Sequence, residues 1–338
     1  MTESIQVPEA VKARFTAYAG LSGIGRAFVA RRIFRPIQER VQIAQKVVRY
    51  APSDKLLDGF INILAGGVGM VEVNKRVRSE VGLQRAFGRR GCAEQSVVQD
   101  TLDACTPENV TQMQAALREI YQHHSQGYRH DYRQEWQLLD VDMTGRPCGP
   151  QAAFATPGYF AHQRNRRGRQ MGYVTATWYE ETVVARLYAG NTQLNTALPD
   201  LVTAAEQTLG LTPFERTRTL VRMDSGGGSV EDINWLLARG YQLHGKDYSG
   251  QRACNLAATV RVWWPDPHNP EREMGWVDTE DQPYCQPVRR IAVRCRKQNG
   301  QWGVGVLVST LWPREVLWLT GHTDVATRDP ATILHAYV

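Results

Sequence analysis

The spacing of apolar residues changes near residue 130 of this 338-residue chain. Before that point they recur every three or four positions, a period that predicts helices with one buried face. The third of these predicted helices has Thr106 as its N-cap and a proline at its first position. The helices are predicted at residues 53–67, with Ser53 as the cap, 92–105 and 106–124. We therefore expect residues 1–130 to form a helical domain.

After residue 130 the pattern becomes that of strands alternating with helices. Strands are predicted at 136–143, 172–179, 182–190, 218–224 and 241–246, and helices at 195–210 and 229–240. A hairpin followed by strand–helix–strand crossovers gives a mixed sheet with helices packed on it. We therefore expect an α/β domain over residues 131–249.

The pattern of apolar residues changes again over residues 250–312, where strand patterns and turn residues predict an all-β insertion. Residues 313–338 are then expected to begin the last part of the α/β core. A helix is predicted to start at Asp329–Pro330 and to run for about two turns.

Charge narrows the class of partner. The chain has a formal net charge of +6 and a pI near 9.0. Residues 11–50 hold nine Lys and Arg, among them Arg31, Arg32 and Arg35, against the single acid Glu39. A second basic cluster lies in the sequence HQRNRRGRQ and consists of Arg164, Arg166, Arg167 and Arg169. Two such patches favour a nucleic acid over an anionic membrane or a merely solvated surface.

The short and long helices at 92–124 are compatible with a helix-turn-helix that reads DNA, and equally with a helical bundle that has no partner. Six scattered cysteines without a Cys-x-x-Cys pair favour reduced thiols over disulfides or a zinc site. The N-terminus lacks the apolar core of a signal peptide, and the longest apolar stretch is too short to span a bilayer. We expect a cytoplasmic, nucleoid-associated protein that binds no membrane.

Two acids lie at the ends of predicted strands. Asp142 ends the first strand, Asp140 lies two positions earlier on the same face, and Asp224 ends the fourth strand. Ligands bind at such strand ends in open sheets. Carboxylates brought together repel one another unless a divalent cation holds both ionised, and oxygen ligands suit Mg²⁺ or Mn²⁺. Each Asp alone would more simply cap a turn, but together they favour a metal site, with Asp142, Asp224 and Asp140 as the expected ligands.

Three glycines follow Asp224, in the sequence VRMDSGGGS. No Gly-Lys-Ser/Thr follows them and the G-x-G-x-x-G spacing is absent, so a nucleotide-binding loop is excluded. The glycines instead predict open space around Asp224 that a phosphodiester can enter. Ser229 is predicted to be the N-cap of the next helix.

These motifs, taken in order, resemble the RNase H-like catalytic core of DDE transposases, and more closely the bacterial insertion-sequence enzymes with a β-rich insertion. The sequences that carry the resemblance are DVDMTG at 140–145, ARLYAGN at 185–191 and VRMDSGGGS at 221–229. Gly227 stands where that family has an aromatic residue. The resemblance covers residues 50–338 and implies that Asp142 and Asp224 are catalytic.

The resemblance also implies a third acid, a Glu just beyond a Tyr on the helix after the insertion. The sequence DPATILHAYV resembles the start of that helix, with Tyr337 in the expected place. Glu315 is predicted to lie in a strand before the helix, so no Glu fits, and we expect the chain to end before the third acid.

The implied activity is metal-dependent cleavage and transfer of DNA strands at element ends, by a homodimer bound to double-stranded DNA. The four arginines of the second cluster are expected to bind phosphates from a loop between the first two strands. Arg222 and Lys246 are expected as ion-pair partners of the aspartates. Two alternatives remain open: a DNA-binding protein without chemistry, and a metal-dependent nuclease of the same fold.

Overall fold

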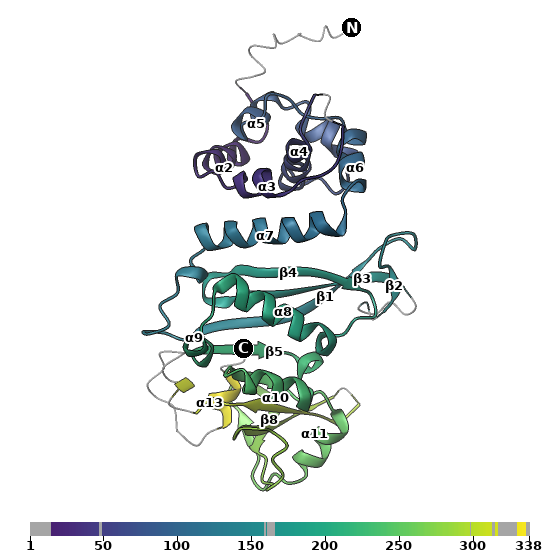
Figure 1. Cartoon of the computed structure of the whole chain (residues 1–338). Coiled ribbons are helices and arrows are strands. Elements are labelled where there is room, and N and C mark those ends of the chain that lie inside the picture. The colour runs from purple at the N-terminus through teal and green to yellow at the C-terminus, as the bar shows by residue number, and fades with distance from the viewer. Residues whose placement is uncertain are drawn as a thin grey trace. The chain divides into compact units, whose positions relative to one another are not determined.

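The computed structural model describes residues 15–46, 49–158, 160, 166–297, 299–312, 315–316 and 330–335 (Figure 1). The chain divides into two compact units, Met1–His124 and Ser125–Val338. None of the helices in these described ranges is long and apolar enough to cross a membrane.

The first unit is helical. Its elements are α2 (Ala19–Ala30), α3 (Arg35–Arg40), α4 (Pro52–Leu64), a π-helical turn (Val73–Val77), α5 (Val81–Ala86), α6 (Gln95–Asp103) and α7 (Pro107–His124). Its main core packs apolar residues of α4 and α6 against the π-helical turn and the end of α5. Within this core Arg89 donates two hydrogen bonds to Asp58, whose side chain is fully buried.

Two local features of this unit differ from the sequence prediction. Helix α4 begins at Pro52 with Ala51 as the N-cap, so Ser53 lies inside the first turn; the fixed φ of proline suits the first helical position. Helix α2 was not predicted, because three glycines lower its helix propensity. One of them, Gly25, is buried against the ring of Phe87, which leaves no room for a Cβ atom.

The second unit is built on one mixed sheet, so the predicted α/β class is confirmed. Among the described residues the strand order is β2-β3-β1-β5-β6-β10-β9-β8-β7, and β4 pairs with β3 beyond β2, on the edge away from β1. The strands are β1 (Gln137–Pro147), β2 (Thr156–Pro157), β3 (Arg167–Ala176), β4 (Glu181–Ala189), β5 (Thr219–Met223), β6 (Gln242–Lys246), β7 (Trp264–Asp266), β8 (Asn269–Trp276), β9 (Arg289–Arg296) and β10 (Trp302–Ser309).

Helices connect and cover these strands. They are α8 (Leu194–Leu209), α9 (Pro213–Thr217), α10 (Val230–Ala238), α11 (Gly250–Ala257) and α13 (Pro330–His335). Helix α8 ends at Gly210, which adopts the left-handed conformation, and α10 begins at Ser229, whose hydroxyl accepts the Asp232 N–H, both as predicted. Strand β1 runs antiparallel to β3 and parallel to β5, and β5 runs parallel to β6.

The segment predicted as an all-β insertion differs in two ways. It begins with helix α11, because the Ser249 hydroxyl caps the first turn and Arg252 pairs with Asp247. Its strand β10 then pairs antiparallel with β6, so the β-rich strands extend the core sheet. Glu315, predicted in a strand, is helical, and its carboxylate accepts the N–H of Trp312 at 2.5 Å.

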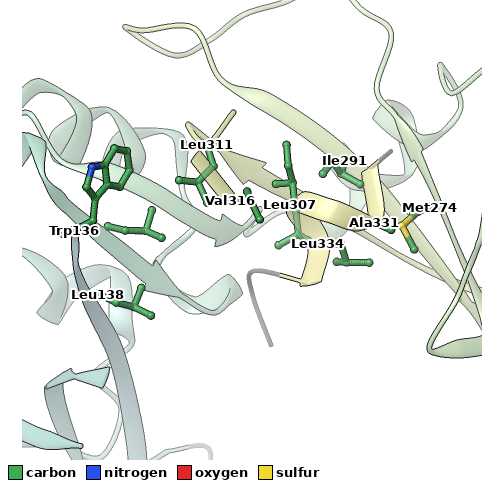
Figure 2. Close-up of a cluster of buried hydrophobic side chains, with 11 residues drawn as sticks. Trp136, Leu138, Met274, Ile291, Leu307, Leu311, Val316, Ala331 and Leu334 are labelled. Carbon is green, nitrogen blue, oxygen red and sulfur yellow. The ribbon is translucent and has the colours of Figure 1, made fainter. Parts of the chain in front are cut away.

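The two faces of β1 have different partners. Gly172 on β3 is the register partner of Met143 on β1, and a Cβ atom at Gly172 would lie against Leu201 of α8. Leu139 and Val141 are on the same face of β1 as Met143, so this face lies against α8. The other face carries a buried cluster at the start of the strand, shown in Figure 2. Its members are Trp136, Leu138, Leu220, Met274, Ile291, Leu307, Leu311, Val316, Ala331, Ile333 and Leu334. Helix α13, at the β8 end of this cluster, therefore packs on the face of the sheet opposite α8 (Figure 2).

Candidate carboxylate site

The site lies where β1 and β5 run side by side. Asp140 on β1 is the register partner of Arg222 on β5, and both strands run in the same direction. Asp142 and Asp224, each two residues further on, therefore lie at the same level on the same face. Neighbouring strands are about 4.8 Å apart, so the two acids lie beside each other. Asp224 directly follows β5, but Asp142 was predicted to end its strand and instead lies in the middle of β1, which continues to Pro147 in its pairing with β3.

The neighbouring strands extend this row. Tyr173 on β3 is the partner of Asp142, and Lys246 on β6 occupies the level of Asp224. Tyr173 forms a short hydrogen bond with Thr144, which lies two residues after Asp142. The row therefore places a phenol and an ammonium group on either side of the two acids.

Asp140 has a different environment from Asp142. Its two carboxylate oxygens accept hydrogen bonds from Arg222 at 2.6 and 2.7 Å. The hydroxyl of Thr177, in the turn after β3, donates a third bond at 2.7 Å. The expected ion pair between Arg222 and an aspartate is thus present, and it engages Asp140 rather than Asp142 or Asp224.

Asp142 and Asp224 accept only local main-chain hydrogen bonds among the described residues. The Met143 N–H donates to Asp142 at 2.7 Å, and the Gly226 N–H donates to Asp224 at 2.8 Å. Partial desolvation raises the pKa of Asp142 above its ordinary value; the Met143 bond lowers it, and the charges of Asp224 and Asp140 raise it. Each carboxylate therefore keeps one oxygen that accepts no hydrogen bond among the described residues, and both side chains line an open space.

That space is a groove of about 500 Å³ lined by Asp140, Val141, Asp142, Arg222, Met223 and Asp224. Mg²⁺ is commonly bound by one or two carboxylates together with water and substrate phosphate oxygens. Two neighbouring carboxylates that line one groove, with the pKa of Asp142 raised, fit this donor set. Among the described residues no group of three His, Cys, Asp or Glu side chains is placed to hold a metal, so Asp142 and Asp224 would do so as a pair.

The glycines after Asp224 serve close packing. A Cβ atom on Gly228 would lie 1.7 Å from the Lys246 carbonyl oxygen, so this residue sits against the backbone of β6. A Cβ atom on Gly227 would lie 2.8 Å from the Met223 sulfur, so an aromatic residue would not fit there without a shift of the core. The turn thus holds Asp224 at the end of β5, because it has no side chain against the backbone of β6 or against Met223.

The second basic cluster is placed differently from the prediction. Arg167 and Arg169 lie on strand β3 and not in a loop, because β1 continues to Pro147 and draws these polar positions into the antiparallel pair. Their guanidinium groups donate to the carbonyls of Ala155 and Ala153. Arg166 is exposed just before β3, and Arg164 lies outside the described residues.

The first basic patch is exposed on the helical unit. Arg31 and Arg32 follow α2, and Arg35 begins α3, where it pairs with Glu39 at 2.6 Å. Arg40 is engaged with Glu119 of α7. These arginines form a basic surface within one unit of the protein.

Sequence reasoning missed Thr177 and Tyr173 as neighbours of the acids. No sequence pattern indicates these two residues, since only the antiparallel register of β1 and β3 brings them beside Asp140 and Asp142.

Comparison with known proteins adds little. No family model matches the chain, and no curated protein is similar to it in sequence. One similar solved structure is described as "Cryo-EM structure of piggyBac transposase synaptic complex with hairpin DNA", with a TM-score of 0.45 and 10% identity; the similarity covers 99% of this chain and 68% of that one. A TM-score below 0.5 supports no argument, so the functional conclusion rests on the residues described above.

Proposed function

We propose that this protein is a DNA transposase whose Asp142 and Asp224 bind Mg²⁺ or Mn²⁺ and support cleavage and transfer of DNA strands. The observation that carries the proposal is the parallel register of β1 and β5, which places the two carboxylates level on one face of a groove. We further propose that β4-β3-β1-β5-β6 is an RNase H-like core, because its element order matches the one on which the sequence resemblance rests.

The residues of this site have separate roles in the proposal. A divalent cation held by both carboxylates would supply activation of a nucleophile and stabilisation of the leaving oxygen during attack on a phosphodiester. Asp142 and Asp224 hold the cation through the oxygens that face the groove. The Asp140–Arg222 pair joins β1 to β5 beside them, since Arg222 donates to both Asp140 oxygens and Thr177 donates to one of these.

Double-stranded DNA is the proposed partner, bound by a homodimer. The support is the exposed basic surface with Arg31, Arg32 and Arg35, together with Arg166 beside β3. Lys and Arg that neutralise phosphates release counterions, so binding is expected to weaken steeply as salt rises. Binding that stays constant between about 50 and about 200 mM salt would contradict the proposal.

Metal binding tests the site directly. Calorimetric titration of the 338-residue chain with MnCl₂ should show binding that Asp142→Asn and Asp224→Asn each abolish. The matched control is Asp278→Asn, which changes an exposed acid paired with Arg261 in the β-rich part of the sheet. If all three variants bind Mn²⁺ like the parent, the aspartate pair does not hold the cation.

The alternatives differ in their products. A DNA-binding protein without chemistry is favoured by one observation, namely that no third acid is grouped with the pair among the described residues. Incubation with labelled duplex DNA and Mn²⁺ separates the cases. Joined strands indicate transposition, shortened strands alone indicate a nuclease, and binding without either indicates the non-catalytic alternative.

A further inference from the structure

The helical unit contains a second hollow, far in sequence from the aspartates. It has a volume of about 380 Å³ and lies between the end of α2, the start of α3, and residues of α4 and α5. Its lining includes Phe28, Phe34, Phe87, Val29, Arg32 and Arg35. Small-molecule sites have volumes of about 300–1,000 Å³ and combine apolar walls with a few polar groups. This hollow has both properties.

The aromatic wall is rigidly packed. The ring of Phe28 lies 6.0 Å from that of Phe87 and 5.7 Å from that of Phe60, between centroids. Phe34 contacts Phe60 at 6.3 Å. Phe87 is almost completely buried, and Leu57 behind the hollow is also buried. The surface that a ligand would meet therefore exists before the ligand arrives.

Arg32 is held at the hollow in an unfavourable backbone conformation. Its φ is +53°, in the left-handed region that favours glycine. The cause is the end of α2: the Arg32 N–H donates to Val29 and the Ile33 N–H donates to Phe28, a Schellman motif. Glycine is the residue that this position accepts most easily, yet the chain has an arginine there. Such strain is characteristic of positions kept for binding.

The positive charges around the hollow favour an anionic ligand. Among the described residues Arg32 forms no ion pair, and the Arg35 partner Glu39 is a half-exposed i+4 contact that a stronger anion can replace. Arg31 adds a further cation one residue away. A ligand with a flat apolar body and an adjacent negative charge is complementary to this arrangement.

We propose that this hollow binds one unstacked nucleotide of DNA, with its base against the partly exposed Phe28 and Phe34 and its phosphate on Arg32. Every base has a face that stacks on aromatic rings, so such a pocket accepts a base without reading its identity. A base leaves a duplex most easily where it is unpaired. The inference rests on the proposed DNA partner but not on the carboxylate chemistry.

The test compares two duplexes that differ in one base. Both carry a fluorescent label and a single-nucleotide bulge, and in one of them the bulged position is abasic. Anisotropy titration of the full chain should show the base-bearing duplex bound about 5- to 150-fold more tightly, the range expected for one stacked base. The backbone charge is the same in both, so the ratio reports the base alone.

Three variants locate the effect. Gln38→Trp fills the hollow from an exposed lining position and should bring the ratio close to one. Arg32→Gly should weaken binding of the base-bearing duplex while raising the melting temperature, because it removes the backbone strain. Arg31→Ala removes an equal charge outside the hollow, so it should weaken both duplexes alike and leave the ratio unchanged.

The outcomes separate this inference from the proposed function. Equal affinity of the parent for the two bulged duplexes overturns the pocket and leaves the DNA partner intact. A ratio that survives Gln38→Trp also overturns the pocket as the place where the base binds. Absence of binding to either duplex at low salt overturns the DNA partner. Binding of an acidic, aromatic peptide that Gln38→Trp abolishes, without any base effect, replaces the nucleotide by a protein ligand.

Discussion

Replacing Asp142 with asparagine is expected to stabilise the protein in the absence of divalent cations. Asp142 on β1 and Asp224 just after β5 lie on neighbouring segments, whose backbones are about 5 Å apart, and we take that spacing for their carboxylates. Two charges at that distance repel by about 0.8 kcal/mol in water and about 3 kcal/mol at an effective dielectric constant of 20. Both side chains are exposed, so the lower part of this range applies, and we expect a gain of about 1 kcal/mol at low salt.

Asp140→Asn provides a control with the opposite sign. Asp140 lies two residues before Asp142 on the same face, but its carboxylate binds Arg222 through two charge-assisted hydrogen bonds. Hydrogen bonds to charged groups contribute about 1.5–3 kcal/mol, so this variant should destabilise by about that amount. The same chemical change thus raises stability at one position and lowers it at the next position on that face.

The pH dependence tests whether ionisation of Asp142 is the cause, which partial desolvation opposes first and the charges of Asp224 and Asp140 after it. The pKa of Asp142 is raised in the folded protein, so ionisation opposes folding. The penalty is absent below the ordinary aspartate pKa of about 3.9 and is complete only above the raised pKa. The gain from Asp142→Asn should therefore be present at pH 7 and vanish near pH 3.

Thermal unfolding measures these effects. A change of 1 kcal/mol shifts the midpoint by about 2–4 °C for a domain of this size. Mg²⁺ at ten times its dissociation constant should then stabilise the parent protein by about 1.4 kcal/mol. It should not stabilise Asp142→Asn. If Asp142→Asn destabilises like Asp140→Asn, or if its gain persists at pH 3, the two carboxylates do not repel one another as the register requires.

Three further substitutions test the packing. Asp58→Ala removes the buried partner of Arg89 and should cost about 3–5 kcal/mol, seen as faster hydrogen exchange across α4; unchanged exchange would contradict a buried pair. Leu334→Ala opens a cavity in the cluster beneath α13 and should cost about 2–5 kcal/mol in urea unfolding, whereas no change would mean that α13 is not docked. Gly228→Ala should cost at least about 1–3 kcal/mol by steric overlap with β6, whereas Gly250→Ala, with open space around it, should not destabilise; equal effects would refute the close approach.

The sequence predicted those elements whose signals are local. The helix that ends at Gly210 and the one capped by Ser229 are present as expected, because a cap or a left-handed glycine acts on its own turn. The strands that carry Asp142 and precede Asp224 were also predicted, since buried strands have a strong apolar pattern, but the first of them was predicted to end at residue 143 and continues to Pro147. Helix α2 was missed because its glycines are explained only by the approach of Phe87.

The candidate site shows the same division. The sequence named three aspartates and could place Asp140 and Asp142 on one face by period two. It could not distinguish their environments, which depend on the register between β1 and β5: Arg222 meets Asp140, and Asp224 meets Asp142. A shift of this pairing by one residue would put Arg222 and Asp224 on the opposite face from the acids of β1.

The sequence by itself thus determined the α/β class, the helical N-terminal unit, and the residue types available for metal and phosphate binding. The tertiary structure alone decided that β10 extends the core sheet, that Arg167 and Arg169 belong to a strand, and that Arg32 borders an aromatic hollow. The physical reason is that caps, turns and periodicity act within a few residues, whereas register and close packing join segments that are far apart in the chain.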